Sequence, residues 1–178
     1  MKHTSFSPAG KVALMGLLAA TAVVLSFLEG LLPSLPFLPP GAKAGFSNVA
    51  VMFTATFWGG PAALGVALVK SMFVLSTRGI TAFAMSLCGG LLSATVMWVC
   101  VRLRASLIAT GILGALTHNT AQLAVAMAIT ATPGLLSYYP LLLLFAVVAG
   151  TITGLLLKLT YPPLCRMANY LTLPQKRG

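Results

Sequence analysis

The sequence predicts an all-α integral membrane protein, a bundle of six transmembrane helices with both termini in the cytoplasm. Three observations lead to this fold class. The 178 residues are 58% hydrophobic and only 7% charged, which is more apolar than a soluble domain of this length tolerates. Long apolar runs alternate with short stretches rich in proline, glycine or basic residues. The basic residues lie mostly on one side of these runs, as expected when positive charges orient membrane helices.

Each apolar run predicts one span, because roughly 20 apolar residues cross a hydrocarbon core of about 30 Å. The longest interruption is the proline-rich stretch 33–41, and Gly59-Gly60 and Arg78-Gly79 mark two tight breaks. The second run is short for a full crossing. A single membrane domain, residues 1–178, is therefore expected, with spans at about 12–32, 44–57, 61–77, 80–101, 106–130 and 136–159.

The distribution of Lys and Arg predicts the orientation. Six spans with a cytoplasmic N-terminus leave only Lys43 and Arg78 outside, while Lys70 lies within the third span. The remaining basic residues then all face the cytoplasm, and these are Lys2, Lys11, Arg102, Arg104, Lys158, Arg166, Lys176 and Arg177. Aromatic residues agree, with Trp58, Trp98 and Tyr161 at the inner interface and Tyr138 and Tyr139 at the outer. The predicted location is a bacterial cytoplasmic (inner) membrane, crossed several times.

The first run could also be a signal peptide, because Lys2 and Lys11 precede it and Ala20-Thr21-Ala22 resembles a cleavage site. The apolar run continues past that point to Leu32, which favours a helix that is retained.

Composition argues against several functions. The net charge of +10 would suggest nucleic acid in a soluble protein, but these basic residues lie between membrane spans. Diphosphate chemistry normally needs clustered carboxylates to hold Mg²⁺, and Glu29 is the only carboxylate side chain in the sequence. There is no Walker loop for ATP, and neither His3 nor His118 has partners at metal-ligand spacing. We therefore expect a protein that is not an enzyme and binds no cofactor itself.

Polar residues within the spans are the first candidates for function, because polar groups are costly in a membrane. In the predicted orientation they lie mainly in the outer half. His118, Asn119 and Gln122 are three and four residues apart, so they can share one helical face. These positions predict an outward-facing substrate site formed by Glu29, Lys43, Asn48, Lys70, Arg78, His118, Asn119 and Gln122.

Lys43, Lys70 and Arg78 outnumber Glu29 in this half, which favours a small-molecule substrate with an anionic group. The alternative is purely structural. Glu29 would then only pair with Lys43 or Lys70, and His118 and Asn119 would only hydrogen-bond between helices. The motif Gly150-x-x-x-Gly154 likewise fits ordinary helix packing within the chain.

Three stretches resemble a known family. They are Gly41-Ala-Lys-Ala-Gly-Phe-Ser-Asn48, Ser86-Leu-Cys-Gly-Gly-Leu-Leu-Ser-Ala-Thr-Val-Met-Trp98 and Gly114-Ala-Leu-Thr-His-Asn-Thr-Ala-Gln122. Their sequences and order resemble the Gx transporter family, also labelled heptaprenyl diphosphate synthase component I. That family is similar to the substrate-binding S components of energy-coupling factor (ECF) transporters. The resemblance covers about residues 11–159.

The resemblance implies a six-helix S component that works with a transmembrane T component and two ATPase subunits, which would use ATP. S components contact the T component through small residues of the first helix, here Ala9, Ala13, Gly16 and Ala20. The synthase label implies instead a non-catalytic membrane partner in prenyl diphosphate formation for a quinone side chain. A small secondary transporter is a third possibility, although the sequence shows no inverted repeat.

Overall fold

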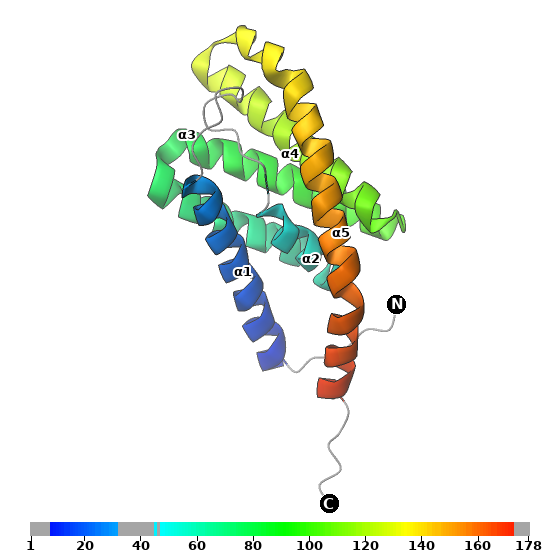
Figure 1. Cartoon of the computed structure of the whole chain (residues 1–178). Coiled ribbons are helices and arrows are strands. Elements are labelled where there is room, and N and C mark those ends of the chain that lie inside the picture. Colours follow the sequence, from blue (N-terminus) through cyan, green and yellow to red (C-terminus); the bar gives the residue numbers. More distant parts are fainter. Residues whose placement is uncertain (1–7, 32–44, 46, 173–178) are drawn as a thin grey trace, which may run out of the picture.

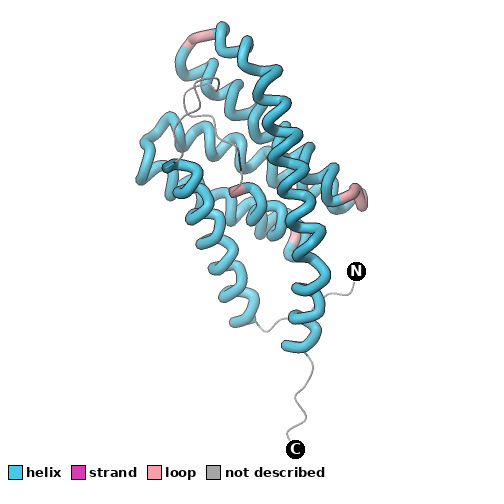
Figure 2. Tube along the Cα trace, viewed as in Figure 1, coloured by secondary structure: helices cyan, strands magenta, loops and turns pink. Residues whose placement is uncertain are grey.

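The computed structural model describes residues 8–31, 45 and 47–172, and within them every regular element is a helix (Figures 1 and 2). The all-α prediction is confirmed for this part of the chain. The helices are α1 (Pro8–Leu31), α2 (Asn48–Trp58), α3 (Gly60–Arg102), α4 (Leu107–Thr130), the 3₁₀ helix η1 (Pro133–Tyr138) and α5 (Tyr139–Thr172).

Four helical stretches are long and apolar enough to cross a membrane, namely Val12–Leu31, Gly60–Arg102, Leu107–Thr130 and Pro133–Pro162. The chain is therefore a multi-pass membrane protein. Helix α2 has 11 residues, about 16 Å at 1.5 Å per residue, which is roughly half of the hydrocarbon thickness. Helix α5 continues to Thr172, past the predicted end of the sixth span at 159, but its apolar part ends at Pro162.

Helix α3 is a hairpin of two antiparallel segments, 60–78 and 80–102. Gly79 has non-helical angles of φ 81° and ψ −176°, a region open essentially only to glycine. Contacts between the segments are nearly symmetric about Gly79: the hydroxyl oxygens of Ser71 and Ser86 are 3.3 Å apart, and Gly60 lies under the ring of Trp98. Gly59 has nearly the same angles and joins α2 to α3. Two single glycines thus reverse the chain twice.

Helices α4 and α5 touch through their backbones (Figure 1). A Cβ on Gly154 would lie 2.5 Å from the Cα of Ile108, and one on Gly111 would collide with the carbonyl oxygen of Gly150. Small residues at four-residue spacing allow such close contact in membranes. Gly150 and Gly154 therefore serve packing within the chain.

Helix α1 is the most peripheral of the four long helices. Only 17% of its most apolar window is buried, compared with 39–44% in the other three. It is held through Ala22, which belongs to the same core cluster as Met52 and Met97, and through an edge-on contact of Phe27 with Phe73 whose ring centroids are 6.4 Å apart. The face of α1 away from the bundle remains open.

One end of the bundle collects aromatic side chains from three helices. The rings of Phe57 and Tyr161 are 5.1 Å apart, and the guanidinium of Arg102 lies 5.2 Å from the ring of Trp98. Tyr139 begins α5, 22 residues before Tyr161, which corresponds to about 33 Å along a helix. The aromatic residues thus form two levels, separated by about one hydrocarbon thickness.

Candidate functional site

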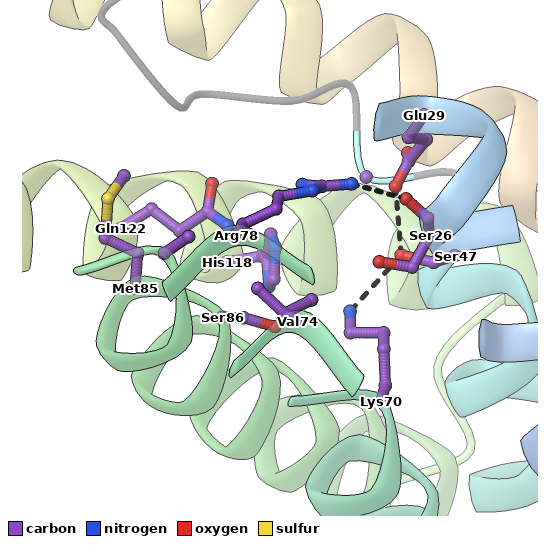
Figure 3. Close-up of a pocket in the computed structure, with 12 residues that line it drawn as sticks. Ser26, Glu29, Ser47, Lys70, Val74, Arg78, Met85, Ser86, His118 and Gln122 are labelled. Carbon is purple, nitrogen blue, oxygen red and sulfur yellow. Dashed lines mark hydrogen bonds between the residues drawn. The ribbon is translucent and has the colours of Figure 1, made fainter. Parts of the chain in front are cut away.

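A chain of buried polar groups links α1, the entry to α2 and α3 (Figure 3). The hydroxyl of Ser47 donates to the Glu29 carboxylate at 3.1 Å. The ammonium of Lys70 donates to the Ser47 hydroxyl oxygen at 3.2 Å and to the Asn48 side-chain oxygen at 3.0 Å. Each of these side chains is at most 7% exposed. Ser47 therefore bridges the only carboxylate side chain and a buried lysine.

Asn48 leaves one donor unused. A lysine ammonium can only donate, so the amide oxygen of Asn48 must face Lys70 and its amide nitrogen must point the other way. That nitrogen is buried and has no hydrogen-bond partner among the residues that the structure describes. An unsatisfied buried donor costs roughly 1–3 kcal/mol, and such groups are rare enough to need an explanation.

His118 of α4 reaches the same place. Its side chain is 3% exposed, and its Nδ1 atom is buried without a hydrogen-bond partner in the described part of the chain. The ring lies directly over Gly89, where an added Cβ would be 2.9 Å from Nδ1. A Cβ on Gly45, in turn, would lie 3.3 Å from the Asn48 amide nitrogen and 3.9 Å from the His118 ring. Gly45 thus keeps the space between the two unsatisfied groups clear.

These groups surround a small cavity. Its volume is about 30 Å³, room for about two water molecules, whereas pockets for whole ligands measure roughly 300–1,000 Å³. The lining combines charged, polar and apolar side chains, and it comprises Ser26, Glu29, Gly45, Ser47, Lys70, Val74, Arg78, Ala82, Met85, Ser86, His118 and Gln122.

Arg78 lies at the edge of the cavity beside the Gly79 turn. Its guanidinium donates from Nη2 to the carbonyl oxygen of Ser26 and packs on Gly30, where a side chain would collide with it. The residue is only partly buried. It therefore holds the end of α1 against α3 and also places a second positive charge near Lys70.

The structure brings most of the predicted site residues together. Asn48 borders the cavity through Lys70 and Gly45. Asn119 is buried nearby, but its amide donates to the Leu142 carbonyl oxygen of α5 at 3.3 Å, and it does not line the cavity. Lys43 lies outside the described residues. The predicted residues that line the cavity are Glu29, Lys70, Arg78, His118 and Gln122.

The chain matches a known protein family. Residues 18–160 match the family model for heptaprenyl diphosphate synthase component I. The chain belongs to this family. The resemblance predicted from the three sequence stretches is thus confirmed, and the matched region contains every residue that lines the cavity. No curated protein matches the chain, and no solved structure matches it either.

Several residues of the site were not predicted from the sequence. Ser47 is the central bridge, and Ser26 and Ser86 also line the cavity. A serine in an apolar helix commonly bonds its own backbone, so it carries little signal. Ser47 and Ser86 could have been found, because each lies within one of the quoted stretches.

The cavity is suited to binding by hydrogen bonds and charge. Among the described residues, no group of three His, Cys, Asp or Glu side chains is placed to hold a metal ion. The lining includes the basic groups of Lys70 and Arg78 and the ring of His118, and the Asn48 amide lies next to Lys70 and Gly45. This arrangement can stabilise a negatively charged or strongly accepting group.

Proposed function

We propose that this protein is the substrate-binding S subunit of an ECF-type importer in the bacterial cytoplasmic membrane. The observation that carries the proposal is the polar cavity, beside which two buried groups, the Asn48 amide nitrogen and His118 Nδ1, have no hydrogen-bond partner among the described residues. Structural polar groups within a helix bundle normally satisfy one another. The two unpartnered groups beside this cavity therefore support a role in ligand binding.

The proposed orientation places the cavity at the outer face. It assumes six spans, with α3 supplying two and α2 a short one, and both termini in the cytoplasm. The excess of basic residues outside the cavity end supports this orientation. So do the two aromatic levels, because Trp58, Trp98 and Tyr161 lie at the opposite end from Gly79. A nutrient would then enter near Arg78.

The proposed energy source is ATP hydrolysis by partner subunits. The open face of α1 is the candidate contact with a T component. Ala13, Gly16 and Ala20 are exposed there, and nothing lies within 4 Å of a Cβ added to Gly16. Ala9 belongs to the same predicted set, and its side chain lies outside the described part of the chain. Small residues let another helix approach closely.

A second function is supported by the family description itself, which names a component of a prenyl diphosphate synthase. The chain would then be a non-catalytic membrane partner of a separate catalytic subunit. Its one carboxylate side chain leaves it without the acidic cluster that normally holds Mg²⁺ and diphosphate, so the catalysis would lie in that subunit.

Affinity purification from native membranes distinguishes the two functions. An S subunit should co-purify with a polytopic T component and two ATPases, identified by mass spectrometry. Gly16→Leu and Ala20→Leu should each abolish that association, because the larger side chain blocks close helix approach. Ala128→Leu, on an exposed position of α4, should leave it unchanged. Recovery of a prenyl diphosphate synthase without ATPases would support the second function and refute the first.

Transport provides an independent check. The purified chain alone in liposomes should bind but not accumulate substrate, since it has no motif for nucleotide hydrolysis. Concentrative uptake by this chain alone, driven by a proton or sodium gradient, would instead identify a secondary transporter.

A further inference from the structure

We propose that the cavity seats the anionic group of the substrate, a carboxylate or a phosphate, while the rest of the molecule lies toward Met85. The inference deepens the proposed function, since it names the substrate class of the same site. It rests on the hydrogen-bonding capacity, charge and size of the cavity.

The unused hydrogen-bonding capacity around the cavity is that of donors. The orientation of the Asn48 amide is fixed by Lys70, so the group left over is an N–H₂ and requires an acceptor. Lys70 has three N–H bonds, of which Ser47 and the Asn48 oxygen accept two. His118 supplies a further donor when Nδ1 carries a proton. Acceptor-only groups such as carboxylate and phosphate oxygens satisfy all of these at once.

The charges lead to the same class. Among the described residues that line the cavity, two are basic, Lys70 and Arg78, and one is acidic, Glu29. The Glu29 carboxylate accepts a hydrogen bond from the Ser47 hydroxyl. A single negative charge beside Lys70 would neutralise the cluster, and buried charges are stable only when paired.

The volume limits what can enter. A space of about 30 Å³ admits a group of about two heavy atoms beyond its attachment point, such as a carboxylate, and a phosphate only with small shifts. A whole nutrient does not fit. Figure 3 shows Met85 and Gln122 on the far side of His118 from Lys70 and Ser47. Met85 lies on that side, so it is where we expect the remainder of the substrate to lie.

The first test uses simple anions, because the substrate itself is unidentified. The full-length protein in nanodiscs of neutral phosphatidylcholine would be melted with acetate, inorganic phosphate or inorganic diphosphate, against chloride at equal ionic strength. At least one of the three should raise the melting temperature in a saturable way. The absence of any such rise for all three anions would overturn the proposal.

Asn48→Asp tests the location. Aspartate keeps an acceptor for Lys70, so the bundle should stay folded, but it replaces the unpartnered amide donor beside Gly45 with a negative oxygen. The concentration of anion that gives half of the effect should rise about tenfold or more. Gln122→Glu provides a second carboxylate variant from another helix, should Asn48→Asp not insert. Asn119→Ala is the matched control, since the Asn119 amide donates its hydrogen bond to α5. This variant should keep the rise in melting temperature caused by the anion. An undiminished effect in both carboxylate variants would overturn the proposal.

The source of the anionic group is a separate arm. Replacing part of the neutral lipid with phosphatidylglycerol should leave the effect of the soluble anions intact if the substrate is a soluble molecule. If the lipid alone reproduces the rise in melting temperature and Asn48→Asp removes it, the same chemistry recognises a lipid headgroup. Failure of this inference and failure of the proposed function give different results. If ATPases co-purify with the protein but no anion binds to it, only the inference is overturned. If an anion binds but no ATPases co-purify, only the proposed importer function is overturned.

Discussion

The bridge from Glu29 through Ser47 to Lys70 predicts strong energetic coupling between two residues on different helices. Replacing Lys70 with Met removes two hydrogen bonds, of 3.0 and 3.2 Å, and leaves the buried Glu29 carboxylate without this compensating charge. Removing one partner of a buried charge pair costs about 3–5 kcal/mol. Replacing Glu29 with Gln keeps an acceptor for Ser47 but leaves Lys70 beside Arg78, at a cost of about 1–3 kcal/mol.

The double variant should be less destabilised than the sum of the single variants. Met at position 70 and Gln at position 29 leave neither charge behind, so a coupling energy of about 1–3 kcal/mol is expected. Unfolding free energies of the three variants in bicelles, measured by steric trapping, give this coupling directly. Lys158→Met, at an exposed site of α5, should change stability by less than about 0.5 kcal/mol.

Additive effects within about 0.5 kcal/mol would refute the bridge as an energetic unit. The same double variant also separates structure from binding. If Lys70 only pairs with Glu29, the folded double variant should keep its ligand affinity. If Lys70 faces the ligand, as we propose, binding should be lost while the bundle remains folded.

Three further predictions concern packing and topology. Gly111→Ala should destabilise the bundle by about 1–3 kcal/mol through overpacking against Gly150. Gly65→Ala is the control: a Cβ at this position meets no atom within 4 Å, so the variant should be neutral or stabilising by up to about 1 kcal/mol. Equal melting temperatures for the two variants would contradict this prediction. Gly79→Ala should cost about 1–3 kcal/mol because of the positive φ, and an unchanged melting temperature would show that the turn is not strained by a side chain. In intact cells, a cysteine at Thr132 should react with a membrane-impermeant maleimide and one at Ser106 only after permeabilisation, in a background without the native cysteines; the opposite pattern would invert the proposed orientation.

The sequence predicted the helical architecture because its signals are local. Proline, glycine and charge mark the ends of apolar runs, and Arg78-Gly79 lies where α3 reverses. The choice of polar residues as site candidates also depended on one general cost, that of polar groups in a membrane. Glu29, Lys70, Arg78, His118 and Gln122 all line one cavity.

What the sequence could not predict depends on helix rotation and packing. His118 and Asn119 are neighbours, yet one faces the cavity and the other bonds the backbone of α5. Sequence spacing allows both on one face, and only the backbone contact of α4 with α5 decides between them. The bridging role of Ser47 is equally non-local, because it requires α1 and α3 to approach the entry of α2 from opposite sides.

The order of the chain has a consequence for biosynthesis. Every hydrogen-bond partner of Lys70 in the bridge precedes it in the sequence, as does Glu29 behind Ser47. Chains are made from the N-terminus, so when Lys70 leaves the ribosome, the groups that neutralise it have already been synthesised. Lys70 can therefore enter the bilayer together with its hydrogen-bond partners, as part of a nascent assembly of α1, α2 and the first half of α3. His118 arrives later, and it closes the site only when α4 is inserted.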